Sequence, residues 1–380
     1  MKTIIQIAPV IEEGSGVAAV AANLEREWQQ LGIATERFTM TEAHGGWIPT
    51  PEGGLAAKVA HIVHVVWFSL VGALMARRAL AGREDVVTIC HNDALVGDVY
   101  VNHGIVHAAM EARGARWWRT VRNPVHLFTG ARDTLRYGSR HIHAAVVNLV
   151  AADDRDLRRF YPRVIPPTTI IGNGVDTDRF TPANPDARAR ARADMGLTDD
   201  DLAIVFIGHE YERKGLPALL DAVAAGPDHW HLVVVGGTPD MVRRLRDSQH
   251  GRALGPRLHT VGSTPDPRPH LAAGDVLAFP SAYESHGLVV LEALACGLPV
   301  VATATGCVPD VVTSGVNGFV VEADPLSIRS ALYDADAADR TAMSRAARST
   351  ALEHTWSDVA RAYLELFDRV RPVPGGWASR

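Results

Sequence analysis

Short apolar runs alternate with longer amphipathic stretches along most of this 380-residue chain. Thr3–Val10 is rich in apolar residues, and Gly16–Leu31 follows it with apolar residues at every third or fourth position. The first pattern is typical of a buried strand and the second of a helix. Strands that alternate with helices in this way favour a parallel sheet covered by helices. The sequence therefore predicts an α/β protein.

The alternation occurs in two series, which predicts two doubly wound domains. The expected strands of the first series are 3–10, 33–39, 86–90, 99–102 and 144–149. Those of the second series are 168–172, 202–207, 232–235, 258–261, 276–279, 300–302 and 318–321. Two domains also agree with the length of the chain. Pro162, Pro166 and Pro167 indicate a stiff, non-helical connection between the two domains. We therefore expect domains at 1–164 and 165–356 and a last helix with a tail at 357–380.

Composition excludes several classes of protein. Apolar residues make up 47% of the chain, which argues against broad disorder. The net charge is −5 and no long basic run occurs, so nucleic acid is not an expected partner. Three widely spaced cysteines fit neither a disulfide framework nor a zinc site, and they favour a reducing cytoplasm. The first residues contain Gln6 and Pro9 and favour a strand over a signal peptide.

Val59–Ala76 is an apolar segment without Asp, Glu, Lys or Arg over 18 residues. This length is at the lower edge for a membrane-spanning helix. Three interpretations stay open: a helix buried against a sheet, a helix with Trp67 and Phe68 against lipid, and a true span. Peripheral contact with the inner face of a membrane is therefore one expectation for this segment.

Two carboxylates, Glu284 and Glu292, accompany an expected helix that follows the apolar run 276–279. We expect Glu292 two turns inside this helix, about 12 Å further along its axis. Acids at that separation cannot share one proton or one metal ion. The amides between them are those of Ser285, His286, Gly287 and Leu288. Free amides at a helix start favour a phosphate, so the segment fits an extended ligand, with an ordinary amphipathic helix as the alternative.

A basic pair, Arg213 and Lys214, follows the expected strand 202–207 and its next residue, Gly208. Arg offers a planar fork of donors, whereas Lys offers a mobile point charge. Together they can neutralise a diphosphate at the turn before the next helix. A pair of solvated surface charges is the alternative interpretation.

Gly14 and Gly16 follow the first expected strand and match a dinucleotide-binding fingerprint, with Glu36 twenty residues after Gly16. An NAD-dependent oxidoreductase is therefore one alternative. Six residues separate Ile7 from Gly14 and include Pro9, whereas a tight pyrophosphate turn would begin nearer the strand.

His103 stands at the end of the expected strand 99–102, directly before a glycine. His107 lies four residues later, but no third ligand presents itself, so we expect no metal site here. A histidine at such a position is either structural or part of a binding site.

These motifs together resemble the family-4 retaining glycosyltransferases (glycosyl transferases group 1). The resemblance is carried by Glu284-x7-Glu292 with the following Ala-Leu-Ala-x-Gly-x-Pro-Val-Val-Ala, by the strand-Gly208 segment with Lys214-Gly, by His103-Gly and by the turn at Asn173-Gly-Val-Asp. It is strong from about residue 172 to 321 and weaker from residue 1. In that family two Rossmann-like domains face a central cleft, the GT-B architecture, and bind a nucleotide-sugar.

The resemblance implies roles for single residues. His103, Arg213, Lys214 and Glu284 are the expected catalytic residues. The expected donor-binding residues are Gly14, Gly16, Gly208, Arg213, Lys214, Glu284, Ser285, His286, Gly287, Leu288 and Glu292. The two cations would stabilise the leaving diphosphate, Glu292 would bind the ribose, and Glu284 and His103 would contact the sugar. No metal or other cofactor is expected.

The chain also departs from the family pattern. His209 stands where many members carry Arg, and Cys307 and Asp310 replace the usual Gly and Glu of a later loop. Asp176 and Asp178 mimic the metal-binding Asp-x-Asp of the other large glycosyltransferase architecture, but they lie in an expected turn.

The resemblance implies an enzyme that transfers a hexose, with retention of configuration, from a nucleoside diphosphate sugar to the hydroxyl of a saccharide, glycolipid or small molecule. It also implies that the last helix returns to the first domain. With the cysteine content, we expect the enzyme to be cytoplasmic. A sugar-nucleotide epimerase of the same architecture, an NAD-dependent oxidoreductase and a non-catalytic binding protein are the alternatives.

Overall fold

The computed structural model describes residues 3–14, 16–49, 54–112, 114, 124–139 and 141–370. They form two compact units. The first unit consists of Met1–Asn173 and Trp356–Arg380, and the second of Gly174–Thr355.

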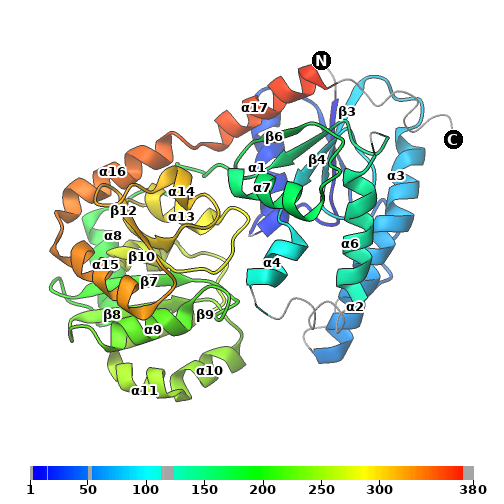
Figure 1. Ribbon diagram of the computed structural model, residues 1–380. Coiled ribbons are helices and arrows are strands. Elements are labelled where there is room, and N and C mark those ends of the chain that lie inside the picture. The colour runs from blue at the N-terminus through cyan, green and yellow to red at the C-terminus, as the bar shows by residue number, and fades with distance from the viewer. Residues whose placement is uncertain are drawn as a thin grey trace. The chain divides into compact units, whose positions relative to one another are not determined.

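The first unit contains a six-stranded parallel sheet in the order β2-β1-β3-β4-β5-β6 (Figure 1). Its strands are β1 (Thr3–Ile7), β2 (Thr35–Phe38), β3 (Val86–His91), β4 (Val99–Asn102), β5 (Ala145–Asn148) and β6 (Thr168–Ile170). Its helices are α1 (Gly16–Gln30), α2 (Gly54–Trp67), the π-helical turn η1 (Phe68–Gly72), α3 (Ala73–Leu80), α4 (Val106–Ala112), α6 (Pro124–Tyr137), α7 (Ala151–Phe160) and α17 (Trp356–Arg369). The chain passes from β1 to β2 and returns to β3 on the other side of β1, so the direction of winding reverses between β1 and β3.

The second unit contains another six-stranded parallel sheet, in the order β12-β11-β10-β7-β8-β9. Its strands are β7 (Leu202–Ile207), β8 (Trp230–Val235), β9 (Leu258–Gly262), β10 (Val276–Phe279), β11 (Val300–Thr303) and β12 (Gly318–Val321). Its helices are α8 (Pro185–Ala193), α9 (Leu216–Ala224), α10 (Pro239–Asp247), α11 (Gln249–Leu254), η2 (Gly255–Arg257), α12 (Arg268–Ala273), α13 (Leu288–Ala295), α14 (Val308–Val311), α15 (Pro325–Ala337) and α16 (Arg340–Leu352). Here the winding reverses between β7 and β10.

The central strands of both sheets are buried on both faces. All six residues of β3 are buried, and so are the four residues of β10. Strands covered by helices on both sides form continuous apolar runs rather than alternating ones. The two doubly wound parallel sheets confirm the predicted fold class.

Strand β6 belongs to the first unit, whereas the sequence placed it at the start of the second domain. Val146 of β5 pairs with Thr168, and the N–H of Ile171 donates to the carbonyl of Asn148 at 3.0 Å. The prolines before β6 therefore lead into the edge strand of the first sheet and do not separate the units. The division falls between Asn173 and Gly174, not between residues 164 and 165.

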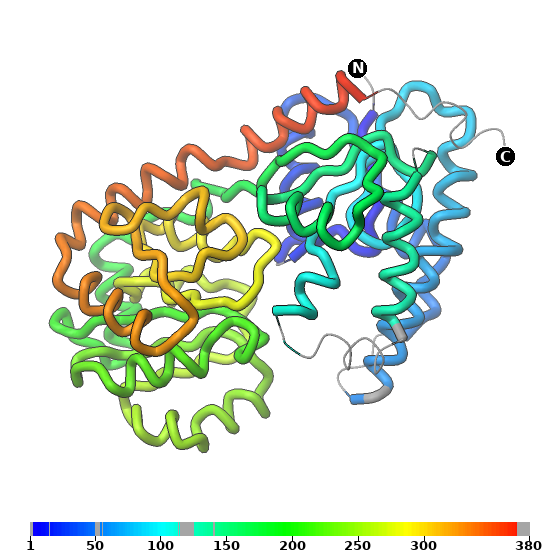
Figure 2. Tube along the Cα trace, viewed as in Figure 1, coloured from blue at the N-terminus to red at the C-terminus, as the bar shows by residue number. Residues whose placement is uncertain are grey.

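The last described helix, α17, packs on α1 within the first unit, as the red and blue segments of Figure 2 show. Trp28 of α1 is fully buried, and its Nε1 donates to the carbonyl of Ala360 at 3.1 Å. Its ring lies edge-on to Tyr363, with 6.1 Å between the centroids, and 5.9 Å from the ring of Phe367. The chain thus completes the core of its first unit with its own last helix.

Truncation of Trp28 tests how much the packing of α17 on α1 stabilises the first unit. We expect Trp28→Ala to lower the free energy of unfolding of the first unit by about 3–5 kcal/mol, because it leaves a cavity between two helices. Circular dichroism during denaturant unfolding measures this loss. Trp47→Ala is the control: Trp47 is 61% exposed and its truncation should cost about 1 kcal/mol or less. If both variants lose the same free energy of unfolding, the α1–α17 contact does not stabilise the first unit more than an exposed side chain does.

Candidate functional site

The predicted residues of the second unit gather beyond the carboxyl ends of β7 and β10. Gly208 directly follows β7, and Arg213 and Lys214 end the loop that leads into α9. Glu284 lies in the loop after β10, which is the neighbour of β7 in the sheet. The two loops touch, because the N–H of Ala282 donates to the carbonyl of Arg213 at 2.8 Å. Ligands of open parallel sheets bind at this kind of place, where the winding reverses.

Glu284 forms ion pairs with both cations. Its Oε1 lies 2.9 Å from Nη1 of Arg213 and 3.0 Å from Nζ of Lys214. The three side chains are only 11–16% exposed. Arg213 also donates Nε to Oε2 of Glu210 at 2.6 Å and Nη1 to the carbonyl of Tyr283. The structure therefore joins the basic pair and the first acid of the predicted motif in one cluster.

Two residues that the sequence analysis missed hold Glu284 in place. Ser281 is fully buried, and its Oγ donates to Oε1 of Glu284 at 2.9 Å. The hydroxyl of Thr303, the last residue of β11, donates to the carbonyl of Ser281 at 2.5 Å. In the sequence, each of the two is recognisable only as a polar residue at the end of a buried apolar run.

Burial and charge act in opposite directions on the two cations. Burial lowers the pKa of Lys214, and the nearby carboxylate of Glu284 only partly offsets this shift. Burial also disfavours the charge of Arg213, but Glu284 and Glu210 outweigh it and raise the pKa of that guanidinium. The Lys214 ammonium also lies 4.4 Å from the ring centroid of Phe279, which favours its charged form.

Two glycines permit close approach around this cluster. A Cβ at Gly208 would lie 2.2 Å from Cδ of Lys214, so this glycine gives the lysine side chain room across the end of β7. Gly306 has φ +56°, and a Cβ there would lie 2.3 Å from the carbonyl oxygen of His286. The absence of a side chain at Gly306 therefore lets its loop pack against the 284–287 loop.

Helix α13 begins later than predicted. Its first residue is Leu288, and Gly287 precedes it with φ +85°, a left-handed conformation that stops the helix from starting earlier. Glu292 is therefore the fifth helical residue, about 6 Å along the axis from the start, and not two turns inside. Ser285 and His286 precede the helix, so Leu288 alone of the four predicted amides lies in its first turn.

Glu292 is partly buried and titrates near neutrality. Burial raises its pKa to about 7, while the positive charges of Arg179 and Lys214 oppose the rise. Arg179 comes from the turn after Asn173, in which the sequence analysis named no donor-binding residue. Glu292 can therefore gain or lose a proton at physiological pH.

The surrounding protein buries the ring of His286 and orients the ring of His209. His286 is 5% exposed, and burial lowers its pKa to about 3, so it is neutral. Its carbonyl accepts the N–H of Cys307 at 2.7 Å. His209, which stands in place of the family's Arg, accepts the N–H of Gly237 on its Nδ1 at 3.2 Å.

His103 belongs to the first unit, at the carboxyl end of β4, and contacts a second histidine that the sequence analysis missed. Its Nε2 lies 2.9 Å from Nδ1 of His91, the last residue of β3. Nε2 of His91 lies 3.0 Å from Oε1 of Gln6, whose amide nitrogen donates to the carbonyl of Ala21 at 2.9 Å. These three polar side chains form a row at the edge where the strands of the first sheet end.

This row fixes the tautomers of both histidines. Burial lowers the pKa of His91 to about 3, so its ring is neutral and carries one proton. Since Oε1 of Gln6 can only accept, Nε2 of His91 is the donor and Nδ1 accepts from Nε2–H of His103. A neutral His103 then has its lone pair on Nδ1.

Gly14 and Gly16 follow β1 of the first unit and have φ values of +139° and +73°. A Cβ at either position would meet no atom within 4 Å, so conformation and not crowding favours glycine here. The structure thus divides the predicted site residues: Gly14, Gly16 and His103 lie in the first unit and the others in the second. The donor contacts of all of them stay predictions.

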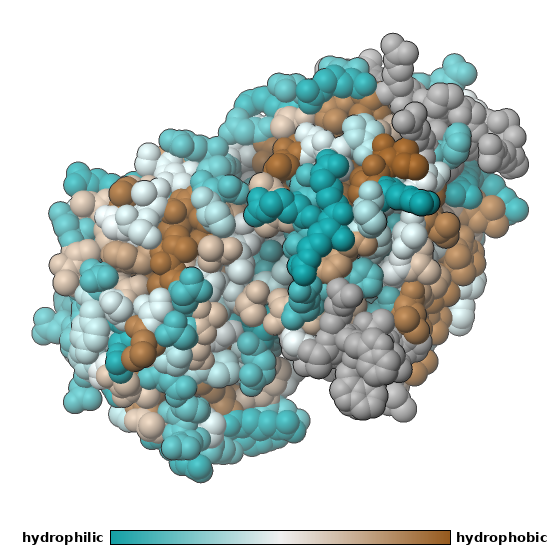
Figure 3. All heavy atoms as spheres, viewed as in Figure 1, coloured by the Kyte–Doolittle hydropathy of each residue, from teal (hydrophilic) through white to brown (hydrophobic). Residues whose placement is uncertain are grey.

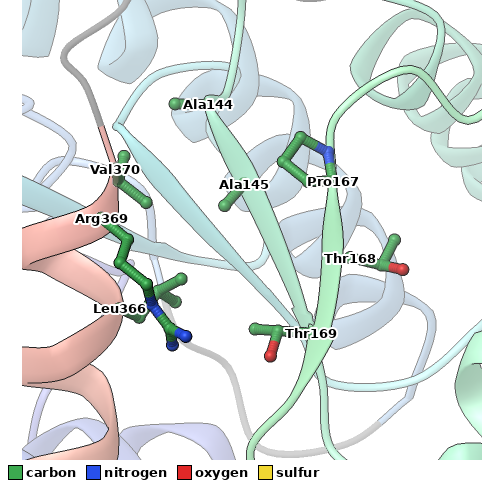
Figure 4. A pocket seen from close by; sticks show the side chains of 8 residues that line it. All are labelled: Ala144, Ala145, Pro167, Thr168, Thr169, Leu366, Arg369 and Val370. Atoms are coloured by element: carbon green, nitrogen blue, oxygen red, sulfur yellow. The ribbon is translucent and has the colours of Figure 1, made fainter.

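The first unit contains a cavity of about 410 Å³ (Figure 4). It lies near the starts of β5 and β6, at the end of the sheet opposite to His103. The lining residues are Ala144, Ala145, Pro167, Thr168, Thr169, Leu366, Arg369 and Val370. They surround the starts of β5 and β6 and the end of α17. Because ligands of such sheets bind beyond the carboxyl ends of the strands, this cavity is not the candidate site.

Removal of the shared carboxylate tests the cluster in the second unit. We expect Glu284→Gln to lower the free energy of unfolding by about 3 kcal/mol, because two largely buried cations lose their counter-charge. The pKa of Lys214 should fall further, which nuclear magnetic resonance titration of its side chain measures. Glu322→Gln, at an exposed position of the same unit, should change stability by about 0.5 kcal/mol or less. An unchanged pKa of Lys214 would show that the ion pair does not form.

Residues 201–335 match the family described as Glycosyl transferases group 1. The chain is also 37% identical over 247 residues to a D-inositol 3-phosphate glycosyltransferase from Xylanimonas cellulosilytica, a match that covers 60% of this chain and 58% of that protein. The chain thus spans about half the length of the first curated relatives that it matches.

Solved structures with low sequence identity share the fold over nearly the whole chain. Sucrose-phosphate synthase from Thermosynechococcus elongatus aligns with a TM-score of 0.74 and 19% identity, and the match covers 97% of this chain and 99% of that one. The Anabaena protein HepE, solved in complex with UDP-glucose, aligns with a TM-score of 0.65 and 20% identity over 97% and 100% of the two chains. These similarities establish a GT-B fold. Within this fold, residues 201–335 of the second unit match the glycosyl transferases group 1 family.

Proposed function

We propose that this protein is a retaining glycosyltransferase that moves a hexose from a nucleoside diphosphate sugar to an acceptor hydroxyl. The observation that carries the proposal is the cluster of Arg213, Lys214 and Glu284 at the point where the second sheet reverses its winding. The group 1 family of residues 201–335 and the relatives named glycosyltransferases support the transferase class. They do not favour an epimerase or an oxidoreductase.

Arg213 and Lys214 would bind the diphosphate and take up its charge as the sugar leaves. No described residue accepts a hydrogen bond from Nη2 of Arg213, so part of its fork is available to a ligand. Lys214 donates one of its three N–H groups to Glu284. Fixed positive charges placed where negative charge develops lower the barrier of such a reaction.

The two acids would bind opposite ends of the donor. Oε1 of Glu284 receives all the hydrogen bonds that described residues donate to this carboxylate. Its Oε2 is therefore the acceptor for a sugar hydroxyl. Glu292, on the first turns of α13, would accept hydrogen bonds from the ribose hydroxyls.

UDP-glucose is the first donor to test, because the fold neighbour HepE was solved with it. In the first unit, His103 and the loop of Gly14 and Gly16 would contact the sugar and phosphate. The bond from the acceptor oxygen to the anomeric carbon would form, and the bond to the diphosphate oxygen would break, on the same face of the sugar. This gives retention without a protein nucleophile. The acceptor hydroxyl would give its proton to the departing diphosphate oxygen. We propose that no metal ion takes part, so a chelator should leave the rate unchanged.

Substitutions in the cluster test the reaction. We expect Lys214→Ala to lower kcat about 10²–10³-fold, because it removes a charge that stabilises the transition state. Glu292→Ala should weaken donor binding about tenfold. Donor hydrolysis or transfer, followed by nuclear magnetic resonance of the product anomer, measures both rate and stereochemistry.

Arg345→Ala is the control for these variants, since Arg345 is exposed on α16 of the same unit, and it should retain full activity. Inversion at the anomeric carbon would refute retention. Full activity of Lys214→Ala would refute the role of the cluster.

Donor affinity should depend on pH through Glu292. Its pKa is about 7 in the free protein, and hydroxyl donors on the bound ribose favour the carboxylate and lower this pKa. Binding then releases a proton, so affinity increases with pH, by about tenfold between pH 6 and pH 8. Calorimetric titration with UDP-glucose measures this, because its diphosphate diester does not titrate in that range. Glu292→Gln should bind with an affinity that is independent of pH, and a slope that persists in this variant would exclude Glu292 as its origin.

A further inference from the structure

The first unit exposes an apolar helix face that the proposed reaction does not use. Among the described residues, one continuous helical segment, Ala56–Leu80, is long and apolar enough to cross a membrane. It runs over 25 residues through α2, η1 and α3, and its mean hydropathy reaches 1.9 over 18 residues. Only 39% of that window is buried in the protein.

The inner side of this segment is built into the first unit. Phe68 is fully buried and packs against Phe38 of β2, with 6.4 Å between the ring centroids. Ser69 is 2% exposed and accepts a hydrogen bond from Nη1 of Arg132 of α6 at 3.3 Å. Trp67 donates its Nε1 to the carbonyl of Ala43 at 3.0 Å. A helix fixed to a sheet and to a buried arginine on one side cannot be surrounded by lipid, so the segment does not span a membrane.

The outer side is a stripe of apolar residues. Val59, Leu70 and Leu74 are 50%, 56% and 48% exposed. Ile62, Val63 and Val66, which lie between them at helical spacing, are partly exposed. We call these six residues the apolar stripe. At about 1.5 Å per residue it extends over about 22 Å, and Figure 3 shows apolar side chains along this side of the unit, over α2 and α3.

The exposed charges of the segment that carries the apolar stripe are basic. No Asp or Glu occurs from Gly54 to Leu80. Lys58 is exposed at one end of the stripe and Arg78 at the other. The neighbouring α6 contributes one acid, Asp133, which is buried and paired with Arg132 and Arg136. An apolar centre with basic ends, on helices that expose no acid of their own, is complementary to a surface of anionic lipid.

We propose that the apolar stripe lies on an anionic lipid bilayer, with its six side chains at the boundary between headgroups and acyl chains and with Lys58 and Arg78 against lipid phosphates. A second copy of this chain is the less suitable occupant. In a symmetric dimer the same patch meets itself, so basic ends would face basic or apolar surface, without a carboxylate from either segment. The inference does not depend on the proposed transfer reaction.

Vesicle flotation with the full chain tests the proposal. We expect wild-type protein to float with vesicles of 70% phosphatidylcholine and 30% phosphatidylglycerol and to bind pure phosphatidylcholine at least tenfold more weakly. L70Q/L74Q should reduce binding to the mixed vesicles at least tenfold, since it places amides in the headgroup boundary. L326Q/L352Q is the matched control: these leucines of the second unit are 67% and 49% exposed, and the control should float like wild type.

Two further measurements make the outcome decisive. Circular dichroism and UDP-glucose binding of L70Q/L74Q should match wild type, because both leucines are exposed and lie in the other unit from Glu284. Light scattering reports the oligomeric state. The proposal is overturned if wild type does not float, if L70Q/L74Q floats equally well, or if wild type is a dimer that L70Q/L74Q dissociates. If wild type does not bind UDP-glucose, that result excludes UDP-glucose as the donor and leaves the lipid proposal unaffected.

Discussion

The geometry of the second unit depends on a single carboxylate shared between two loops. Glu284 follows β10, whereas Arg213 and Lys214 follow β7, and the three meet because these strands are neighbours where the winding reverses. Ser281 and Thr303 fix the acid from behind. Since breaking a largely buried ion pair leaves uncompensated charge, the cluster both orders the loops and holds cations where a diphosphate would lie.

Burial shifts the pKa values of the ionisable groups in the candidate site, and a bound ligand would change these shifts again. Burial lowers the pKa of Lys214 and raises that of Glu292, so both groups are shifted toward their neutral forms. A diphosphate near the lysine and hydroxyl donors near the acid would reverse these shifts. In the first unit, burial keeps His91 neutral, and Gln6 then determines which nitrogen of His103 carries the proton. Burial thus shifts the two ionisable groups of the second unit, whereas hydrogen bonds from buried side chains fix the tautomer of His103 in the first.

Much of the fold was predictable from local pattern. The strand runs, the helix after the first strand and the basic and acidic motifs all follow from residue type and spacing. The boundary was misplaced because prolines before Thr168 indicate a break in regular structure but do not indicate which sheet receives the next strand. The start of α13 was misplaced because the left-handed conformation of Gly287 depends on how its loop packs, which spacing does not reveal. The histidine row and Ser281 were missed because each is a single polar residue whose partner lies on another strand.

The sequence by itself determined the two parallel α/β series, the cations and acids of the second unit, and the uncharged segment from Val59 to Ala76. These depend on periodicity and composition, which are local properties of the chain. The tertiary structure decided that Glu284 pairs with Arg213 and Lys214, that α17 completes the core around Trp28, and that one side of α2 and η1 is buried while the other stays exposed. These outcomes depend on strand order and on packing between distant segments, and side chains far apart in the chain interact only after the sheets have formed.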